Sequence, residues 1–166
     1  SDLFLIADCF PLLEELDLSN PRKGVSRRSL RHGLETLSLA LFKLRKVNLS
    51  GHNYINNQNL LHLFKNCKLL EAVIIFDCFG LTSAGISSSL RERPTLRSLS
   101  LSDSYEQLDY DERLNSHFID SLVSLKGLTC IDLTRLQISD ELLYSIARNT
   151  FQIIDVMFAC ILNVAC

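Results

Sequence analysis

A short apolar pattern, Leu-x-x-Leu-x-Leu with Ile, Val or Phe at some positions, returns six times along the 166-residue chain. The second and third apolar positions of each copy are two residues apart, so both side chains lie on one face of a β-strand. That face must be buried, and the residues that alternate with it must point outward. The copies begin at Leu13, Leu44, Leu70, Leu96, Leu128 and Phe151.

Segments with apolar residues at helical spacing separate these strands. We predict helices over residues 59–66, 83–91, 112–124 and 140–148, and an insertion over residues 103–112. We expect Thr82 or Ser83, and Ser139, to act as N-caps, because their side-chain oxygens can accept hydrogen bonds from the first helical turn. One strand and one amphipathic helix cannot bury their apolar faces alone, but stacked copies form a continuous core. The chain is therefore predicted to be an α/β solenoid, with a curved parallel sheet on the concave side and helices on the convex side.

One unit carries a more specific pattern. Residues 70–86 combine an apolar strand, a turn cysteine at Cys78 and a Leu-Thr-x-x-Gly-Ile helix start at residues 81–86. This unit resembles the cysteine-containing class of leucine-rich repeat found in F-box proteins, the substrate receptors of SCF-type ubiquitin ligases. The segment Leu-Arg-Lys-Val-Asn-Leu-Ser-Gly at residues 44–51 resembles plant F-box/leucine-rich-repeat proteins in particular. The resemblance implies one leucine-rich-repeat domain of about six repeats over residues 1–166. Because both ends of the chain are apolar, we expect a fragment of a longer solenoid.

The resemblance also implies a function. The chain would recognise a protein substrate on its concave face, while other subunits of the ligase supply the transfer chemistry. In that family a Skp-type adaptor binds an F-box that precedes the repeats, and residues 1–166 contain no F-box. The alternative is an autonomous leucine-rich-repeat scaffold or immune-receptor recognition module unrelated to ubiquitin ligation. A small-molecule sensor is a further alternative, but it needs a basic pocket that the outward residues do not provide.

The outward strand residues are mostly small or polar, as a solvated face requires. Ile74 and Phe76 are exceptions, and exposed aliphatic and aromatic surface often marks a binding patch. We predict that a protein partner docks there, unless another part of the protein covers this strand. The predicted partner-binding residues are Ile74, Phe76, Ser98, Ser100, Ser102, Lys46, Asn48, Asp132 and Asp155.

No motif of an enzyme, a cofactor site or a metal site is present, so no catalytic, cofactor or metal-ligating residue is predicted. The acidic insertion lacks the spacing of a calcium loop. His32, His52, His62 and His117 stand alone in the sequence, and we expect each of them on the surface or on a helix flank. The six cysteines never form Cys-x-x-Cys. We predict that they are reduced, mostly buried small hydrophobes in a cytosolic or nuclear protein.

The composition and charge of the chain exclude some classes of partner. A chain with 47% hydrophobic and 22% charged residues is globular rather than disordered. The net charge of -2 is spread along the sequence without a polybasic run, so neither nucleic acid nor a membrane surface is a predicted partner. The longest apolar stretch, residues 151–166, is interrupted by Asp155 and Asn163 and is shorter than the ~20 residues that a membrane span needs.

Overall fold

The structure of the chain is a computed structural model that describes residues 2–21, 27–102, 116–134, 136, 139–149 and 155–157. The side chains of residues 27–30, 149 and 155–157 lie outside this description. So do most of the predicted last repeat and the whole predicted insertion at residues 103–112.

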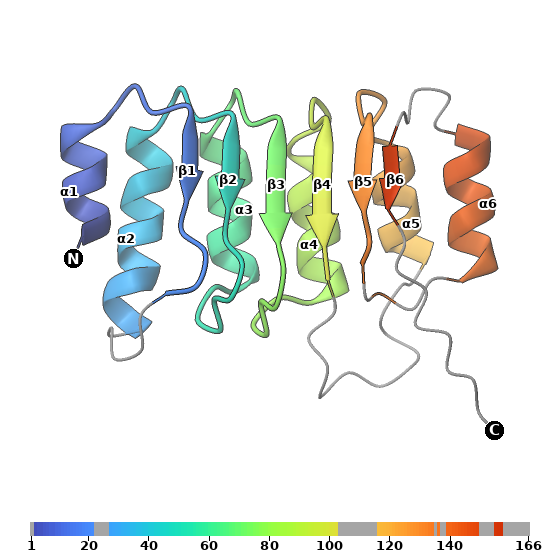
Figure 1. Cartoon of the computed structure of the whole chain (residues 1–166), viewed down its shortest axis with the longest axis horizontal. Helices are drawn as coiled ribbons and strands as arrows, with labels where there is room; N and C mark the ends of the chain where they lie inside the picture. The colour runs from blue at the N-terminus through green and yellow to red at the C-terminus, as the bar shows by residue number, and fades with distance from the viewer. Residues whose placement is uncertain are drawn as a thin grey trace.

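Six short strands form one parallel sheet in the order of the chain (Figure 1). They are β1 (Glu15–Asp17), β2 (Lys46–Asn48), β3 (Ala72–Ile75), β4 (Ser98–Leu101), β5 (Cys130–Asp132) and β6 (Asp155–Met157). Each strand pairs with the next without a register slip, so that Leu16, Val47, Val73, Leu99, Ile131 and Val156 form one row. The predicted repeat and its strand register are confirmed.

Helices cover one face of this sheet and leave the opposite face open (Figure 1). They are α1 (Asp2–Cys9), α2 (Arg27–Ala40), α3 (Asn57–Asn66), α4 (Ser83–Arg91), α5 (Ser116–Val123) and α6 (Asp140–Asn149). The bounds of α4 are as predicted, and those of α3 and α6 differ by one or two residues. Helix α5 begins at Ser116, and residues 112–115 of the range predicted for it lie outside the described residues. The first two helices were not among the predicted ranges.

Side-chain caps explain where the helices begin. Helix α3 starts earlier than predicted because Asn56 accepts from the Asn59 backbone amide at 3.0 Å and the Asn59 side chain accepts in return from the Asn56 amide. This reciprocal arrangement satisfies two otherwise unpaired donors. Thr82 caps α4 by accepting from the Gly85 amide at 3.1 Å. The predicted role of Ser139 is also confirmed, since its hydroxyl accepts from the Leu142 amide at 3.2 Å.

A glycine lets α4 approach α3 closely. A Cβ atom at Gly85 would overlap the side chain of Asn57. That asparagine joins the two helix starts, because its amide donates to the Thr82 hydroxyl at 2.9 Å and its oxygen accepts from the Thr82 amide at 3.0 Å. The Thr-x-x-Gly pattern is therefore explained by helix packing in this unit.

Arg93 is a charged group within the core. Its guanidinium is buried, donates to the carbonyl oxygens of Phe64 and Lys68 at 2.7 Å each, and has its pKa lowered by desolvation. These bonds satisfy carbonyl groups near the end of α3, which the helix itself leaves unpaired.

His52 contradicts the expected surface position. Its side chain is 3% exposed and occupies the turn position that Cys78 holds in the next unit. The Nε2 atom donates to the carbonyl of Leu18, the ring meets Tyr54 edge-on at 4.6 Å, and Nδ1 is buried without a hydrogen-bond partner. Burial lowers the pKa of the imidazole, which favours the neutral form.

The cysteines divide into two kinds. Cys67 and Cys78 are buried, as expected, and burial raises the pKa of each thiol to about 11. Cys9 is exposed and Cys130 is half-buried, so the expectation of burial fails for Cys9. All four of these described cysteines are free, while residues 160 and 166 lie outside the described part of the chain.

Candidate partner-binding surface

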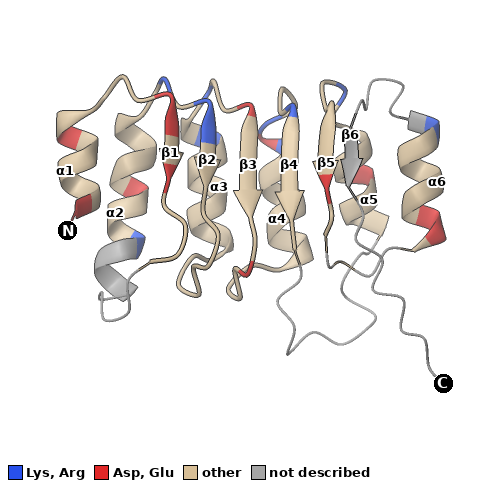
Figure 2. Ribbon diagram, in the orientation of Figure 1, with Lys and Arg blue, Asp and Glu red and all other residues tan. Residues whose placement is uncertain are grey.

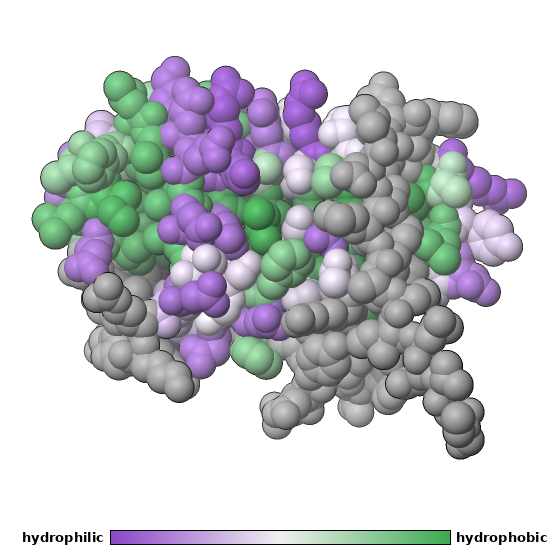
Figure 3. Space-filling model, in the orientation of Figure 1, coloured by the Kyte–Doolittle hydropathy of each residue, from purple (hydrophilic) through white to green (hydrophobic). Residues whose placement is uncertain are grey.

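Outward side chains form rows across the open face of the sheet, because the strands are in register. One row contains Glu15, Lys46, Ala72, Ser98 and Cys130. The next row contains Asp17, Asn48, Ile74, Ser100 and Asp132. Ser19, Ser50, Phe76, Ser102 and Thr134 follow at the strand ends. The rows place the predicted binding residues from 46 to 132 on one surface, part of which is visible in Figure 3.

The centre of this face joins apolar side chains to small ones. Ile74 lies opposite Ser100 in the register of β3 and β4, and Phe76 follows at the end of β3. Both apolar side chains are half-buried, so they are less exposed than the sequence suggested. The hydroxyl of Ser102 accepts from the Asp77 amide at 3.2 Å and that of Ser50 accepts from the Phe76 amide at 3.2 Å. These two serines therefore help to hold the strand ends as well as lining the surface.

The middle row contains a recurring side-chain turn. Asp17, Asn48 and Asp132 each accept a hydrogen bond from the backbone amide two residues further on, at 2.8, 3.1 and 2.9 Å respectively. Asn and Asp side chains commonly stabilise turns in this way. Ile74 and Ser100 occupy the same row, and an isoleucine side chain cannot accept such a bond. In that unit the neighbouring Ser50 accepts from the amide of residue 76 instead.

Asp132, one of the predicted partner-binding residues, has a structural role in its own turn. It is only 8% exposed, and its Oδ1 atom accepts from both the backbone amide and the hydroxyl of Thr134. Its carboxylate is therefore used within the turn. Asp155 lies in β6 and pairs with Cys130 in the register, while its side chain is outside the described residues.

Charged residues lie at the β1 and β2 end of the face. Lys46 Nζ is 3.7 Å from Glu15 Oε2, and both side chains are largely exposed. The amide of Asn48 donates to Asp17 at 3.2 Å. Hydrogen bonds from Ser19 are the main reason that the pKa of Asp17 is lowered. The surface is thus polar at this end and apolar at β3.

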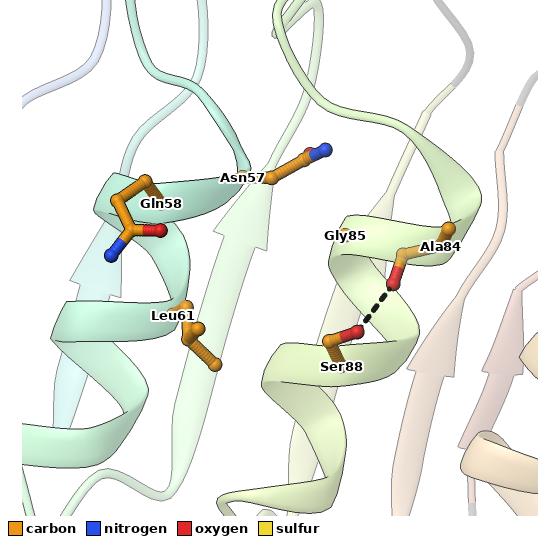
Figure 4. A pocket seen from close by; sticks show the side chains of 6 residues that line it. All are labelled: Asn57, Gln58, Leu61, Ala84, Gly85 and Ser88. Carbon is orange, nitrogen blue, oxygen red and sulfur yellow. Dashed lines mark hydrogen bonds between the residues drawn. The ribbon is translucent and has the colours of Figure 1, made fainter.

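Two further features were not predicted. A shallow groove of about 280 Å³ lies between α3 and α4 on the helix side, lined by Asn57, Gln58, Leu61, Ala84, Gly85 and Ser88 (Figure 4). The small residues at the start of α4 could have indicated this groove from the sequence. Three exposed apolar side chains lie in the turns that precede strands, at Leu12, Phe42 and Leu69. Their sequence position before each strand motif could have revealed them.

Within the described residues, no three His, Cys, Asp or Glu side chains gather as a metal site. Over the same part of the chain, no helix is long and apolar enough to cross a bilayer.

No family model and no curated protein sequence matches the chain, but solved structures do. The C-terminal domain of tropomodulin from Caenorhabditis elegans has a TM-score of 0.65 and 13% identity, covering 90% of this chain and 91% of that one. Actin-binding site 2 of leiomodin-1 has a TM-score of 0.66 and 13% identity, covering 88% and 83%. The fold is a leucine-rich-repeat solenoid. Rad7, solved in complex with Elc1 from yeast, has a TM-score of 0.70 and 16% identity, covering 93% of this chain but 37% of the Rad7 chain.

Proposed function

We propose that this leucine-rich-repeat chain is a protein-interaction module whose partner docks on the open sheet face, centred on Ile74 and Phe76. The carrying observation is a half-buried apolar pair, one in β3 and one just after it, beside three half-buried serines, residues 98, 100 and 102, in β4 and just after it. Such a floor of small side chains leaves space for a partner's side chain to pack against the apolar pair. Binding free energy concentrates in a few apolar or aromatic residues of this kind.

The turn chemistry adds support. Position 74 lies in a row where three other units place an Asp or Asn that holds the strand end. An isoleucine there gives up that local role, and departures from a local pattern concentrate at functional sites. Two of the similar structures also have protein partners, since the leiomodin-1 fragment is an actin-binding site and Rad7 was solved in complex with Elc1.

For the more specific role, we propose the substrate-recognition repeats of an SCF-type F-box protein. The repeat type supports this proposal, because Cys78 fills the buried turn position and donates its S–H to the Leu49 carbonyl at 3.1 Å. Lys46 at the polar end would orient the partner and set its association rate more than its affinity. If the role is correct, the protein expressed from its complete gene should co-purify with a Skp-type adaptor.

The test compares variants that keep the fold. Ile74→Asn copies the residue that Asn48 supplies in the preceding unit and should preserve the strand end. Phe76→Ser removes the aromatic ring, and Phe42→Ser is the matched control, because Phe42 is an exposed ring in a turn away from this face. Each tagged variant is checked by circular dichroism and used for quantitative affinity capture from the source tissue.

The proposal expects a protein that the wild type and Phe42→Ser retain and that the two β3 variants lose by about tenfold or more. Equal capture by all four folded proteins would remove the open face from the binding site. Unfolding of Phe76→Ser alone would show that its ring is structural, and Ile74→Asn would then decide the question.

A further inference from the structure

The turns that lead into the strands share one hydrogen bond. In each of them the backbone amide of the first leucine of the strand motif donates to a carbonyl three residues earlier. These bonds join Leu44 to Leu41, Leu70 to Cys67, Leu96 to Arg93 and Leu128 to Leu125, at 3.1 or 3.2 Å. Both ends of each bond are buried, whereas the residue that follows the acceptor is exposed in all four turns. Most residue types fit that turn position, so the fold does not dictate which residue is found there.

The second repeat exposes apolar side chains where later repeats have other residue types. Phe42 follows the acceptor in its turn and is 52% exposed. Its position holds Lys68, Pro94 and Lys126 in the next three turns. Leu39, near the end of α2, is 69% exposed. Its position holds Lys65 and Arg91 in the next two helices. Two large apolar side chains are thus exposed at the end of α2, where the fold accepts charged residues.

The neighbouring turn adds a third apolar side chain, Leu69, which is 38% exposed. Just after the two turns, the Arg45 carbonyl accepts from the Glu71 amide at 2.7 Å. Just before them, Asn66 of α3 donates to the Ser38 hydroxyl of α2 at 3.0 Å. The two turns therefore lie side by side. Their exposed residues, together with those of the adjoining helix ends, form what we call the turn surface: Leu39, Phe42, Lys43, Lys65, Lys68 and Leu69.

Two lysines of the turn surface are available to a partner. Lys65 lies 3.8 Å from Glu92, but within the described part of the chain neither Lys43 nor Lys68 forms an ion pair. The Nζ atom of Lys43 lies 5.9 Å from the centroid of the Phe42 ring. A cation at that distance over an aromatic face is weakly attracted to it. Basic and apolar side chains are therefore presented together.

The carboxylates beside the turn surface already have a basic partner. Glu71 and Glu14 flank Arg45, at 2.8 and 3.7 Å. Figure 2 shows this alternation as red at the start of β1 and β3 and blue at the start of β2. Residues 22–30, the stretch before α2 and its first turn, contain basic residues and no acidic one. The surface is thus complementary to a partner that carries acidic and apolar groups.

We propose that the turn surface binds an acidic segment of a partner protein. An aromatic or aliphatic side chain of that segment would pack against Phe42 and Leu39, and its carboxylates would pair with Lys43 and Lys68. Exposed ion pairs add little affinity and act on orientation and association rate, so most of the binding free energy would come from the apolar contact. The open sheet face takes no part in this contact. A partner bound at Ile74 should therefore still bind Phe42→Ser, and the two proposals can fail separately.

Two other occupants fit the turn surface less well. A twofold pair of chains would bring the same surface of each copy together, so the lysines of one copy would face those of the other. Basic clusters that bind anionic membranes typically hold about four to eight Lys or Arg residues. The turn surface has three lysines, and Lys65 is already paired with Glu92. An acidic peptide segment meets both the charge and the apolar side chains.

The test selects peptides from a phage library of random dodecapeptides on the wild-type chain and removes those that also bind Phe42→Ser. We expect the remaining peptides to be rich in Asp and Glu and to contain a large apolar residue. The most enriched peptide is labelled with fluorescein and measured by fluorescence polarisation against Lys68→Glu, Leu39→Ser and two controls. Lys126→Glu is the charge control, because Lys126 is exposed at the same position of another turn. Tyr144→Ser is the ring control, because Tyr144 is 71% exposed on α6.

We expect Lys68→Glu and Leu39→Ser to bind the peptide about tenfold or more weakly than the wild type, and both controls to bind it equally well. All the variants should keep the urea midpoint of the wild type, because the replaced side chains are exposed. Enrichment of basic or uncharged peptides, or no peptide that distinguishes the wild type from Phe42→Ser, would overturn the proposal. So would a loss at Lys126→Glu as large as that at Lys68→Glu. A dimer that Phe42→Ser abolishes would make a second copy the occupant, and binding to phosphatidylserine vesicles that Phe42→Ser abolishes would make a membrane the occupant; either result would also overturn it.

Discussion

Replacing Leu99 with alanine tests the strand register at the centre of the solenoid. Leu99 is 0% exposed and lies between Val73 and Ile131, which are also 0% exposed. Removing three carbon atoms costs about 2 to 2.5 kcal/mol at about 0.8 kcal/mol for each buried carbon group. The neighbours on both strands are fixed by pairing, so the cavity should collapse little. The unfolding free energy should therefore fall by about 3 to 5 kcal/mol.

Two matched variants calibrate this loss. Ser100 points to the opposite, open face, and Ser100→Ala should change stability by less than about 0.5 kcal/mol. Leu16 shares the row of Leu99 but is only partly buried at the end of the sheet, so Leu16→Ala should cost about 1 to 2 kcal/mol. Urea unfolding followed by circular dichroism gives all three values, provided that the slopes with denaturant agree. Equal losses at Leu99 and Ser100 would refute the register, and equal losses at Leu16 and Leu99 would refute the difference between the end and the centre.

Three further expectations follow from buried polar and thiol groups. Burial lowers the pKa of His52 below 6.5, so the imidazole binds a proton more readily in the unfolded chain than in the folded one. The imidazole's contribution to stability is therefore present above about pH 6.5 and lost as the pH falls toward the folded pKa. Urea midpoints measured between pH 5 and 7.5 should fall more steeply for the wild type than for His52→Gln. At pH 8 a thiol with a pKa of about 11 is ionised in about one molecule in a thousand. Cys67 and Cys78 should therefore react with a disulfide reagent only on unfolding, while the exposed Cys9 reacts at once; rapid labelling of all three in the native protein would contradict their burial. Arg93→Lys should lose about 1 to 3 kcal/mol of unfolding free energy, because an ammonium group cannot reproduce the planar set of donors to two carbonyls, and a wild-type urea midpoint would show that those bonds contribute little.

The repeat pattern predicted the strands well, because the alternation of inward and outward side chains is visible within a few consecutive residues. A strand of three or four residues with an apolar side chain at every second position has one stable orientation against a row of helices. The caps at Thr82 and Ser139 were predictable for the same reason, since donor and acceptor are three residues apart. Helix α2 was not predicted, although the buried Leu34, Leu37 and Ser38 lie at helical spacing and could have indicated it.

Long-range contacts explain the incorrect expectations. His52 is polar and was assigned to the surface, but its partner is the Leu18 carbonyl, 34 residues earlier in the chain. Phe10 is apolar and belongs to the core position of its repeat, yet no described unit covers it. In both cases the neighbouring unit decides whether the side chain is buried, so the sequence of one repeat alone does not predict its exposure.

On the open face, a hydrogen bond from one unit releases a position of the next unit from its role in a turn. In three units an Asp or Asn of the middle row holds the end of its own strand. The backbone amide of Phe76 donates instead to the Ser50 hydroxyl of the preceding unit, so that turn does not need a hydrogen bond from residue 74. The backbone amide at the strand end still has a hydrogen-bond partner. The side chain at position 74 can therefore be apolar and serve contact with a partner. The hydroxyl of Ser50 thus takes over, for the next unit, the role that an Asp or Asn has elsewhere, so an apolar residue is tolerated at position 74. This coupling between neighbouring units explains why the candidate surface is centred on β3.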